Sequence, residues 1–245
     1  MKHISILALT AFCTASLLTG CKGKDGEAAP ALSGKIVGFA TPYDEAGNSV
    51  AKAGTTVSVE NQNLTATTDA DGRFELGNLK AGTYNVAYTR AGYGTFKRFS
   101  IPHVGGEQPT YLGGVGLSAM STATVSSFSI SPSTGGSYPS IPYRITLNGA
   151  TASGARVIMY ISSQTSVSSA NYAFSYGTGN SGSSTLFGSI DRSYFSGSNL
   201  ASGSTAYAIA YPSSYYSSSY TDPATGRSVN PSLGAPSSVQ TFIVP

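Results

Sequence analysis

The 245-residue sequence has no tryptophan and only two cysteines, Cys13 and Cys21, both near the start of the chain. A fold built from the residues after Cys21 therefore has no disulfide to brace it, and burial of apolar surface must stabilise it alone. Segments of about 100 residues bury enough surface to fold in this way. The length of the chain suggests two such units.

Charge is also scarce, since 10% of the residues are charged and the formal net charge is +3. The lysines and arginines are scattered rather than gathered in a stripe, so nucleic acid is not an expected partner. The composition changes near residue 119, and this change predicts two domains, 32–118 and 119–245. The second of these has no lysine, and its charged residues are Arg144, Arg156, Asp191, Arg192, Asp222 and Arg227.

An apolar stretch runs from Ile4 to Leu18 and follows the positive charge of Lys2. It is too short to span a bilayer, which takes about 20 apolar residues. Together with the small residues that follow, this pattern predicts a secretory signal peptide over residues 1–20. We expect this segment to be the only good helix of the chain.

The run Leu18-Thr19-Gly20-Cys21 resembles the lipobox of bacterial lipoproteins. The resemblance implies cleavage before Cys21, which would then carry a diacylglyceryl thioether and an amide-linked chain such as palmitate. Each buried methylene contributes about 0.8 kcal/mol, so several chains anchor a protein firmly in a membrane. Residues 21–31 would form a lipidated flexible tether. The alternative is an ordinary secreted protein that is cut near Ala15 or Gly20.

Lys22 stands where the inner-membrane retention signal of Gram-negative lipoproteins has aspartate, which favours the outer membrane. Residues 22–27 are similar to the charged export tags of surface lipoproteins. The periplasmic and the extracellular face of the envelope both remain open.

After the signal peptide the sequence has no helical periodicity, and short alternating runs are separated by Gly, Pro, Asn and Ser. This pattern is typical of antiparallel β-sandwiches, so we expect an all-β protein of two sandwich domains. The strands expected in the first domain are 33–40, 55–60, 64–68, 73–76, 82–90, 96–101 and 111–118. Those expected in the second are 125–131, 141–147, 156–162, 172–176, 185–190, 205–211 and 239–244.

The segment Thr68–Tyr84 fits the pattern T-D-x-x-G-x-F-x-L-x-x-L-x-x-G-x-Y at every position. In this it is similar to the carboxypeptidase regulatory-like family. The resemblance covers residues 32–118 and implies a seven-stranded, transthyretin-like (prealbumin-like) Greek-key sandwich. Such domains are non-catalytic appendages of peptidases, receptors and surface proteins.

Asp69, Asp71 and Gly72 occupy a turn in this segment. The aspartates can accept hydrogen bonds from the backbone that follows them, and Gly72 can take a positive φ, which predicts that the flanking strands fold back as a hairpin. Asp-x-Asp-Gly also resembles a calcium loop, so Asp69 and Asp71 are weak metal candidates. The twelfth position from Asp69 is Lys80, where such a loop needs a bidentate glutamate, and this favours the structural turn.

Leu200–Tyr207 in the second half resembles the fibronectin type III corner L-x-P-G-T-x-Y, with one inserted residue and without the proline. In that family the tyrosine hydroxyl ties a crossover to the backbone. The resemblance implies an immunoglobulin-like or fibronectin-like second sandwich.

Residues that could carry catalysis are few. His103 is the single histidine after the signal peptide, and a lone imidazole without cysteine cannot build the usual zinc site. The sequence has no G-x-S-x-G elbow and no phosphate loop, which argues against a serine hydrolase and against a nucleotide cofactor. Asp191 and Asp222 could serve a hydrolase, although turn formation and an ion pair to Arg192 explain them more simply. We expect no catalytic residues and no cofactor.

Tyrosine is abundant, and eleven of the sixteen tyrosines follow residue 137. Tyr211, Tyr215, Tyr216 and Tyr220 lie in one long serine-rich loop. Tyrosine with serine is typical of recognition loops, because the ring is large and rigid while the hydroxyls adapt. These four residues are therefore candidates for ligand binding, although tyrosine is also ordinary material for strands.

The sequence as a whole predicts a lipid-anchored protein of the cell envelope that acts as a non-catalytic binding, adhesive or scaffold module. Its expected partners are the membrane, through Cys21, and a glycan or a surface protein. The alternative within binding is a surface glycan-binding lipoprotein of a polysaccharide-uptake system, and a hydrolase is the less favoured alternative.

Overall fold

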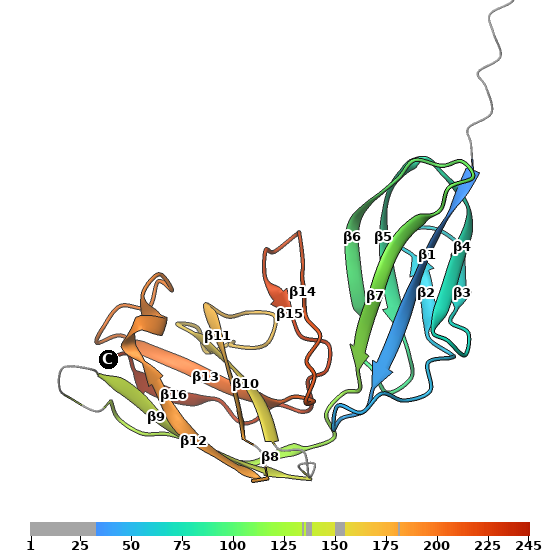
Figure 1. Ribbon diagram of the computed structural model, residues 1–245. Helices are drawn as coiled ribbons and strands as arrows, with labels where there is room; N and C mark the ends of the chain where they lie inside the picture. The colour runs from blue at the N-terminus through green and yellow to red at the C-terminus, as the bar shows by residue number, and fades with distance from the viewer. Residues whose placement is uncertain (1–32, 134, 136–138, 150–154, 181) are drawn as a thin grey trace, which may run out of the picture. The chain divides into compact units, whose positions relative to one another are not determined.

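The computed structural model describes residues 33–245 apart from residues 134, 136–138, 150–154 and 181. The predicted signal peptide, the lipidated Cys21 and the tether 21–31 lie outside the described residues. Leu32–Pro245 form one compact unit. Its elements are β-strands and one 3-10 turn, η1 (Arg192–Phe195), which confirms the predicted all-β sandwich class (Figure 1). None of the described elements is a helix long and apolar enough to cross a membrane.

All seven strands expected before residue 119 are present. They are β1 (Ser33–Tyr43), β2 (Thr56–Val59), β3 (Leu64–Thr67), β4 (Arg73–Lys80), β5 (Gly82–Thr89), β6 (Phe96–His103) and β7 (Thr110–Ser118). They form two sheets, with strand orders β4-β1-β7 and β3-β2-β5-β6, and only β1 and β7 pair in parallel. The two layers are visible in Figure 1.

The core of this first sandwich follows from alternation along its strands. In β5, Val86 and Tyr88 are fully buried and Tyr84 packs at the edge of the same cluster. The Tyr88 ring lies edge-on to Phe74, with the centroids 5.6 Å apart, and edge-on to Phe96 at 6.2 Å. Tyr84, Val86 and Tyr88 therefore share the face of β5 that lines this core.

The turn at residues 69–73 has the predicted local geometry. Asp69 Oδ1 accepts hydrogen bonds from the backbone N–H of Asp71 at 3.0 Å and of Arg73 at 2.8 Å, and Gly72 has a φ of 83°. A Cβ at Gly72 would lie 2.4 Å from the carbonyl oxygen of Ala40, so only glycine fits. The predicted hairpin is wrong, because β3 pairs with β2 whereas β4 pairs with β1. The turn carries the chain from one sheet to the other.

The strands expected after residue 119 are also all present. They are β8 (Thr124–Ile130), β9 (Ser140–Asn148), β10 (Ala155–Ser162), β11 (Phe174–Asn180), β12 (Thr185–Asp191), β13 (Thr205–Pro212) and β16 (Gln240–Ile243). A further short pair, β14 (Tyr220–Thr221) and β15 (Ser228–Val229), was not predicted.

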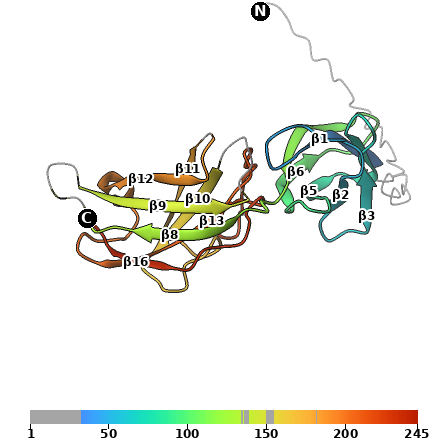
Figure 2. The ribbon, with the colours of Figure 1, turned by 90° about the horizontal axis from the view of Figure 1, so that it is seen from below.

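The second sandwich has sheets of order β12-β9-β8 and β11-β10-β13-β16 (Figure 2). If the seven main strands are lettered A to G in chain order, A, B and E fall in one sheet and C, F and G in the other. These six strands are divided as in an immunoglobulin-like sandwich, whereas the fourth strand, β11, pairs with strand C instead of lying in the sheet of A, B and E. The buried Leu200 belongs to the core between these sheets. Tyr207 lies on the outer side, and its hydroxyl makes no hydrogen bond to a described residue, so the expected corner bond is not found.

Strand β10 has buried side chains on both of its faces. Val157, Met159 and Ile161 belong to the core between the two sheets. Tyr160 points the other way and is also fully buried, under the loop that follows β10 and the long segment that follows β13. We call the residues packed there the outer cluster: Ile158, Tyr160, Val167, Tyr172, Tyr207, Ile209, Tyr211 and Leu233.

Glu45, in the loop after β1, bonds to the segment that leads into β8. Its carboxylate accepts hydrogen bonds from the hydroxyl of Ser121 and from the hydroxyl and N–H of Thr122, at 2.7 and 3.0 Å for Thr122. Its carbonyl oxygen accepts one from the N–H of Tyr215 at 3.0 Å. Burial works to raise the pKa of Glu45, but the hydrogen bonds from Ser121 and Thr122 outweigh it and hold the pKa below its ordinary value.

Two buried tyrosines give a matched test of hydroxyl pairing. The Tyr88 hydroxyl has no hydrogen-bond partner among the described residues, and burial raises the pKa of Tyr88 to about 12. The Tyr160 hydroxyl accepts a hydrogen bond from Asn230 Nδ2 at 2.8 Å. We expect Tyr88→Phe to keep or raise the free energy of unfolding, and Tyr160→Phe to lower it by about 1 kcal/mol. Urea unfolding measures both, and equal losses in the two variants would contradict this assignment.

Glu45 predicts a pH-dependent contribution to stability. Because its pKa is lowered in the folded state, the contribution is fully present above the unfolded pKa and is lost as the pH falls through the folded pKa. Glu45→Gln should lower the free energy of unfolding by up to about 1 kcal/mol at pH 7, and this difference should shrink below about pH 4. Urea unfolding across pH 3–7 measures it. The control is Glu107→Gln, because Glu107 is exposed. If the stability lost in Glu45→Gln relative to wild type were the same at every pH, the prediction would be refuted.

Candidate functional site

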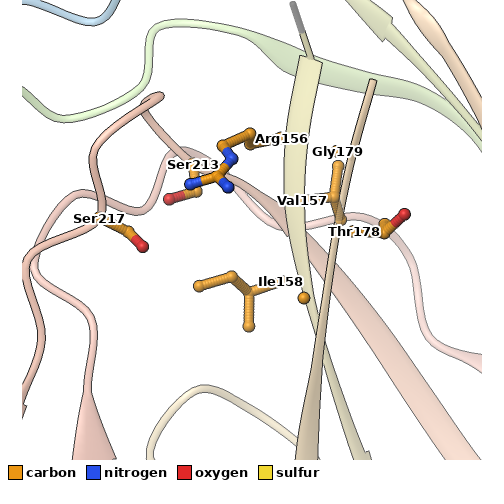
Figure 3. A pocket seen from close by; sticks show the side chains of 8 residues that line it. Arg156, Val157, Ile158, Thr178, Gly179, Ser213 and Ser217 are labelled. Atoms are coloured by element: carbon orange, nitrogen blue, oxygen red, sulfur yellow. The ribbon is translucent and has the colours of Figure 1, made fainter. Parts of the chain in front are cut away.

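A pocket of about 230 Å³ lies on the outer side of the sheet β11-β10-β13-β16 of the second sandwich, where the segment after β13 passes β10 and β11 (Figure 3). Each of these three parts of the chain contributes to its wall. The lining residues are Arg156, Val157 and Ile158 of β10, Gly177, Thr178 and Gly179 of β11, and Ser213 and Ser217 of the segment.

The pairing of β10 with β11 creates the open space. Ile158 lies opposite Gly177, and Arg156 lies opposite Gly179. Phe174 and Tyr176 pack against the core between the sheets, so Gly177, one residue further along the strand, faces the outer side. A Cβ added at Gly177 would meet no atom within 4 Å. The pocket therefore occupies the place where β11 lacks a side chain.

Arg156 is the only charged residue of the pocket lining. Its Nη1 donates a hydrogen bond to the carbonyl oxygen of Tyr215 at 2.6 Å, and its guanidinium carbon lies 5.4 Å from the centre of the Tyr215 ring. A guanidinium carries five N–H donors, so four are not used in this contact. Among the described residues, Arg156 forms no ion pair with a carboxylate.

Three hydroxyl residues line the pocket, and they are not equivalent. Ser213 is buried, and its N–H donates to the carbonyl oxygen of Arg156 at 2.8 Å. The hydroxyl of Ser217 points into the open space beside Ile158 (Figure 3). The hydroxyl of Thr178 accepts a hydrogen bond from Tyr143 at 2.8 Å and points away from the pocket. Arg156, Ser213 and Ser217 supply its polar side chains, and Ile158 supplies an apolar wall.

The structure separates the four tyrosines that were predicted to bind a ligand. Tyr215 and Tyr216 are 41% and 50% exposed, their ring centroids are 5.3 Å apart, and Tyr215 adjoins the pocket through Arg156. Tyr211 packs in the outer cluster, 5.5 Å from the Tyr160 ring. Tyr220 is half-buried, with its ring 5.5 Å from that of Phe96. The binding role of all four stays a prediction, and the pocket favours Tyr215 and Tyr216.

Sequence reasoning did not single out Arg156 or Gly177. A signal for Arg156 was present, because it is a lone cation at the start of the apolar run Val157–Ile161 in a half-chain that has only two acidic residues. No sequence signal points to Gly177, since its importance depends on which residue of β10 lies opposite it.

The two carboxylates considered for hydrolysis each close their own turn. Asp191 caps η1, and its Oδ1 accepts a hydrogen bond from the N–H of Ser193 at 2.8 Å, which lowers the pKa of Asp191. Asp222 accepts one from the N–H of Ala224 at 3.0 Å in the turn between β14 and β15. Among the described residues, the expected ion pair between Asp191 and Arg192 is not formed.

The remaining candidates also have structural partners. His103 is buried, with Nδ1 2.7 Å from the hydroxyl of Thr110 and Nε2 3.2 Å from the carbonyl oxygen of Leu79. Asp69 serves the turn described above. Within the part of the chain that the structure describes, no three His, Cys, Asp or Glu residues are grouped so that they could hold a metal ion.

Residues 36–128 match the family model of the carboxypeptidase regulatory-like domain. This part of the chain is therefore similar to that domain. The match confirms the resemblance seen in Thr68–Tyr84, and it reaches beyond residue 118 into β8. The boundary expected near residue 119 stays a prediction. No curated protein matches the chain.

Three solved structures are similar to parts of this chain. A chain of a type II cohesin–X-dockerin complex from Acetivibrio cellulolyticus is 26% identical, with a TM-score of 0.30; the match covers 35% of this chain and 58% of that one. The chain thus spans less than two thirds of that structure's length. DUF3823 family proteins from Parabacteroides merdae and Bacteroides ovatus are each 14% identical, with TM-scores of 0.32. These matches cover 86% of this chain and 99% and 100% of the other two.

Proposed function

We propose that the protein is a lipid-anchored protein of the cell envelope that acts as a non-catalytic binding module. The observation that carries the binding role is the pocket at Arg156, with the exposed rings of Tyr215 and Tyr216 beside it. Exposed aromatic rings next to a small polar pocket are typical of recognition surfaces.

The residues around the pocket support binding rather than catalysis. General acid–base chemistry needs titratable groups placed on a common substrate, and glycoside hydrolysis needs two carboxylates that face each other. Asp191 and Asp222 each bond to the backbone of their own turn, and His103 is buried between Thr110 and Leu79. The pocket lining itself contains one cation and no acid.

A glycan is the ligand that we favour, and a surface protein is the alternative. Sugar rings could stack on the exposed parts of Tyr215 and Tyr216, whose rings also contact Arg156 and Tyr43, and the adjoining pocket offers hydroxyl and guanidinium donors. In this proposal the protein is a surface glycan-binding lipoprotein, and the carboxypeptidase regulatory-like domain stands between the lipid anchor and the second sandwich.

The membrane anchor of the proposal depends on Leu18–Cys21 and on the acyl chains expected at Cys21. Lys22, next to that cysteine, favours the outer membrane over the inner membrane. Both features are sequence patterns and belong to the proposal.

The anchor predicts the outcome of a labelling experiment. When the full chain is expressed in a Gram-negative host that is fed an alkyne fatty acid, the wild-type protein should be labelled and should sediment with membranes. Cys21→Ala should lose the label and leave the membrane fraction, because alanine has no sulfur to carry the diacylglyceryl thioether. Cys13→Ala is the control and should behave as wild type. A Cys21→Ala protein that stays membrane-bound would exclude the proposed anchor.

The glycan role predicts unequal effects of two exposed tyrosines. Tyr216→Ala should weaken binding to a polysaccharide found by array or pull-down about fivefold, since a lost ring contact is worth roughly 1 kcal/mol. Tyr194→Ala is the matched control, because Tyr194 is 51% exposed and, like Tyr216, has an aromatic neighbour, but it lies in η1. If wild type and Tyr216→Ala bound the polysaccharide with equal affinity, the proposed stacking on Tyr216 would be wrong.

A further inference from the structure

The charge of Arg156 has no counterpart in its own sandwich. The sequence after residue 119 holds four arginines and two aspartates. Both aspartates bond within their own turns, as described above, and the described carboxylates form no ion pair with Arg156. The pocket therefore holds a cation that has no carboxylate of the described residues within ion-pair distance.

The guanidinium of Arg156 is held in place before any ligand arrives. Nη1 donates to the carbonyl oxygen of Tyr215, and the group lies over the Tyr215 ring at 5.4 Å. The donors that remain form the planar fork that pairs with a carboxylate through two parallel hydrogen bonds. Because the side chain is already oriented, binding has less conformational entropy to remove.

The size of the pocket limits what can enter it. Its volume of about 230 Å³ is below the roughly 300–1,000 Å³ of pockets that enclose drug-sized ligands. One sugar unit or one small end group fits this volume, and a longer ligand must continue outside. Tyr215 and Tyr216 are the exposed rings at the surface where it would continue.

The residues that line the pocket favour a sugar acid over an acidic amino acid side chain. Ile158 and the open position at Gly177 give an apolar wall, and Ser217 points its hydroxyl into the same space (Figure 3). A sugar acid has a ring with an apolar face, hydroxyl groups and one carboxylate, so it can use all of these groups at once. An acidic amino acid side chain would use Arg156 but would leave the hydroxyl and the apolar wall without partners.

We propose that this pocket binds a carboxylate-bearing sugar unit of a polysaccharide, with Arg156 pairing to the carboxylate and Ile158 lying under the ring. The proposal rests on the glycan-binding function proposed above and specifies its ligand as an acidic glycan.

The test compares charged polymers with their uncharged counterparts on the full chain. Polygalacturonate and alginate, each beside its carboxyl-reduced form, are titrated by calorimetry at 0.15 M salt, where distant charges are largely screened. Poly-glutamate is included as a peptide that offers carboxylates without sugar rings. We expect at least one acidic polysaccharide to bind ten times more tightly, or better, than its reduced form, and poly-glutamate to bind more weakly.

Three variants locate the effect. Arg156→Gln should lose at least tenfold in affinity for the acidic polymer and none for the reduced one. Arg144→Gln removes the same charge from an exposed position on β9 and should bind as wild type. Gly177→Val keeps Arg156 but fills the pocket, and it should also abolish the preference for acid. Circular dichroism and thermal unfolding confirm the fold of each variant, and a strand tolerates valine at a position where its Cβ meets no atom.

Each adverse outcome has a distinct meaning. Equal binding of charged and reduced polysaccharide, with Arg156→Gln unchanged, overturns the acidic-sugar inference but leaves glycan binding intact. Equal losses in Arg156→Gln and Arg144→Gln overturn it as well, because they indicate attraction by overall charge. Binding of poly-glutamate alone overturns it in favour of a protein partner. If no glycan binds at all in an array, both the inference and the proposed glycan function fail.

Discussion

Strand β10 has to bury both of its faces, and the second sandwich is organised around this requirement. Val157, Met159 and Ile161 fill the core between the sheets, while Tyr160 points outward with no exposed surface. Most antiparallel sheets of a sandwich leave their outer face in water, and such a face cannot hold a fully buried tyrosine. A cover is therefore needed, and the loop between β10 and β11, with Val167 and Tyr172, supplies it together with the segment between β13 and β16.

Polar contacts hold this cover in position on the apolar outer cluster. Asn230 donates to the Tyr160 hydroxyl at 2.8 Å, and the Tyr172 hydroxyl donates to the carbonyl oxygen of Ser228 at 3.0 Å. Arg227 lies over the Tyr172 ring at 5.3 Å. Buried tyrosines need partners for their hydroxyls, so each of these contacts lowers the cost of burying a ring. These contacts explain why the segment follows a fixed path although it is rich in serine.

The candidate pocket is a consequence of where that cover ends. Along the outer face of β10, Tyr160 is buried, Ile158 is half-buried and Arg156 is exposed. The cover is complete over the tyrosine and incomplete over the arginine. The glycines of β11 lie beside this uncovered end of β10. The open space is therefore found where the cover over β10 ends.

The strands could be predicted from the sequence, because alternation of apolar and polar residues is a local property. All fourteen expected strands are present, and so is the turn geometry at Asp69 and Gly72. Pairing is not local, and the expected hairpin across this turn was wrong for that reason. The outer cluster was missed as well, although the nearly continuous apolar run Val157–Ile161 is typical of a strand buried on both faces.

The candidate site was predictable only in its composition. Serine and tyrosine after Tyr211 suggested recognition, but they could not show that Tyr211 faces the outer cluster while Tyr215 faces solvent. That distinction depends on the path of the cover, which the partners of β10 determine. The role of Gly177 depends on the register of β10 and β11, and a single sequence contains no direct information on register.

Scarcity of charge gives Arg156 its importance. On a surface with many charges, one more cation changes the local potential little, and nearby acids compete for it. After residue 119 the surface is built mainly of Ser, Thr, Gly and Tyr, and both acids are bound within their own turns. A single oriented guanidinium then dominates the field in its pocket, while the neutral surroundings attract few ions of either sign. The same composition, poor in charge and in cysteine, therefore leaves the fold to depend on burial and lets one arginine select ligands by their charge.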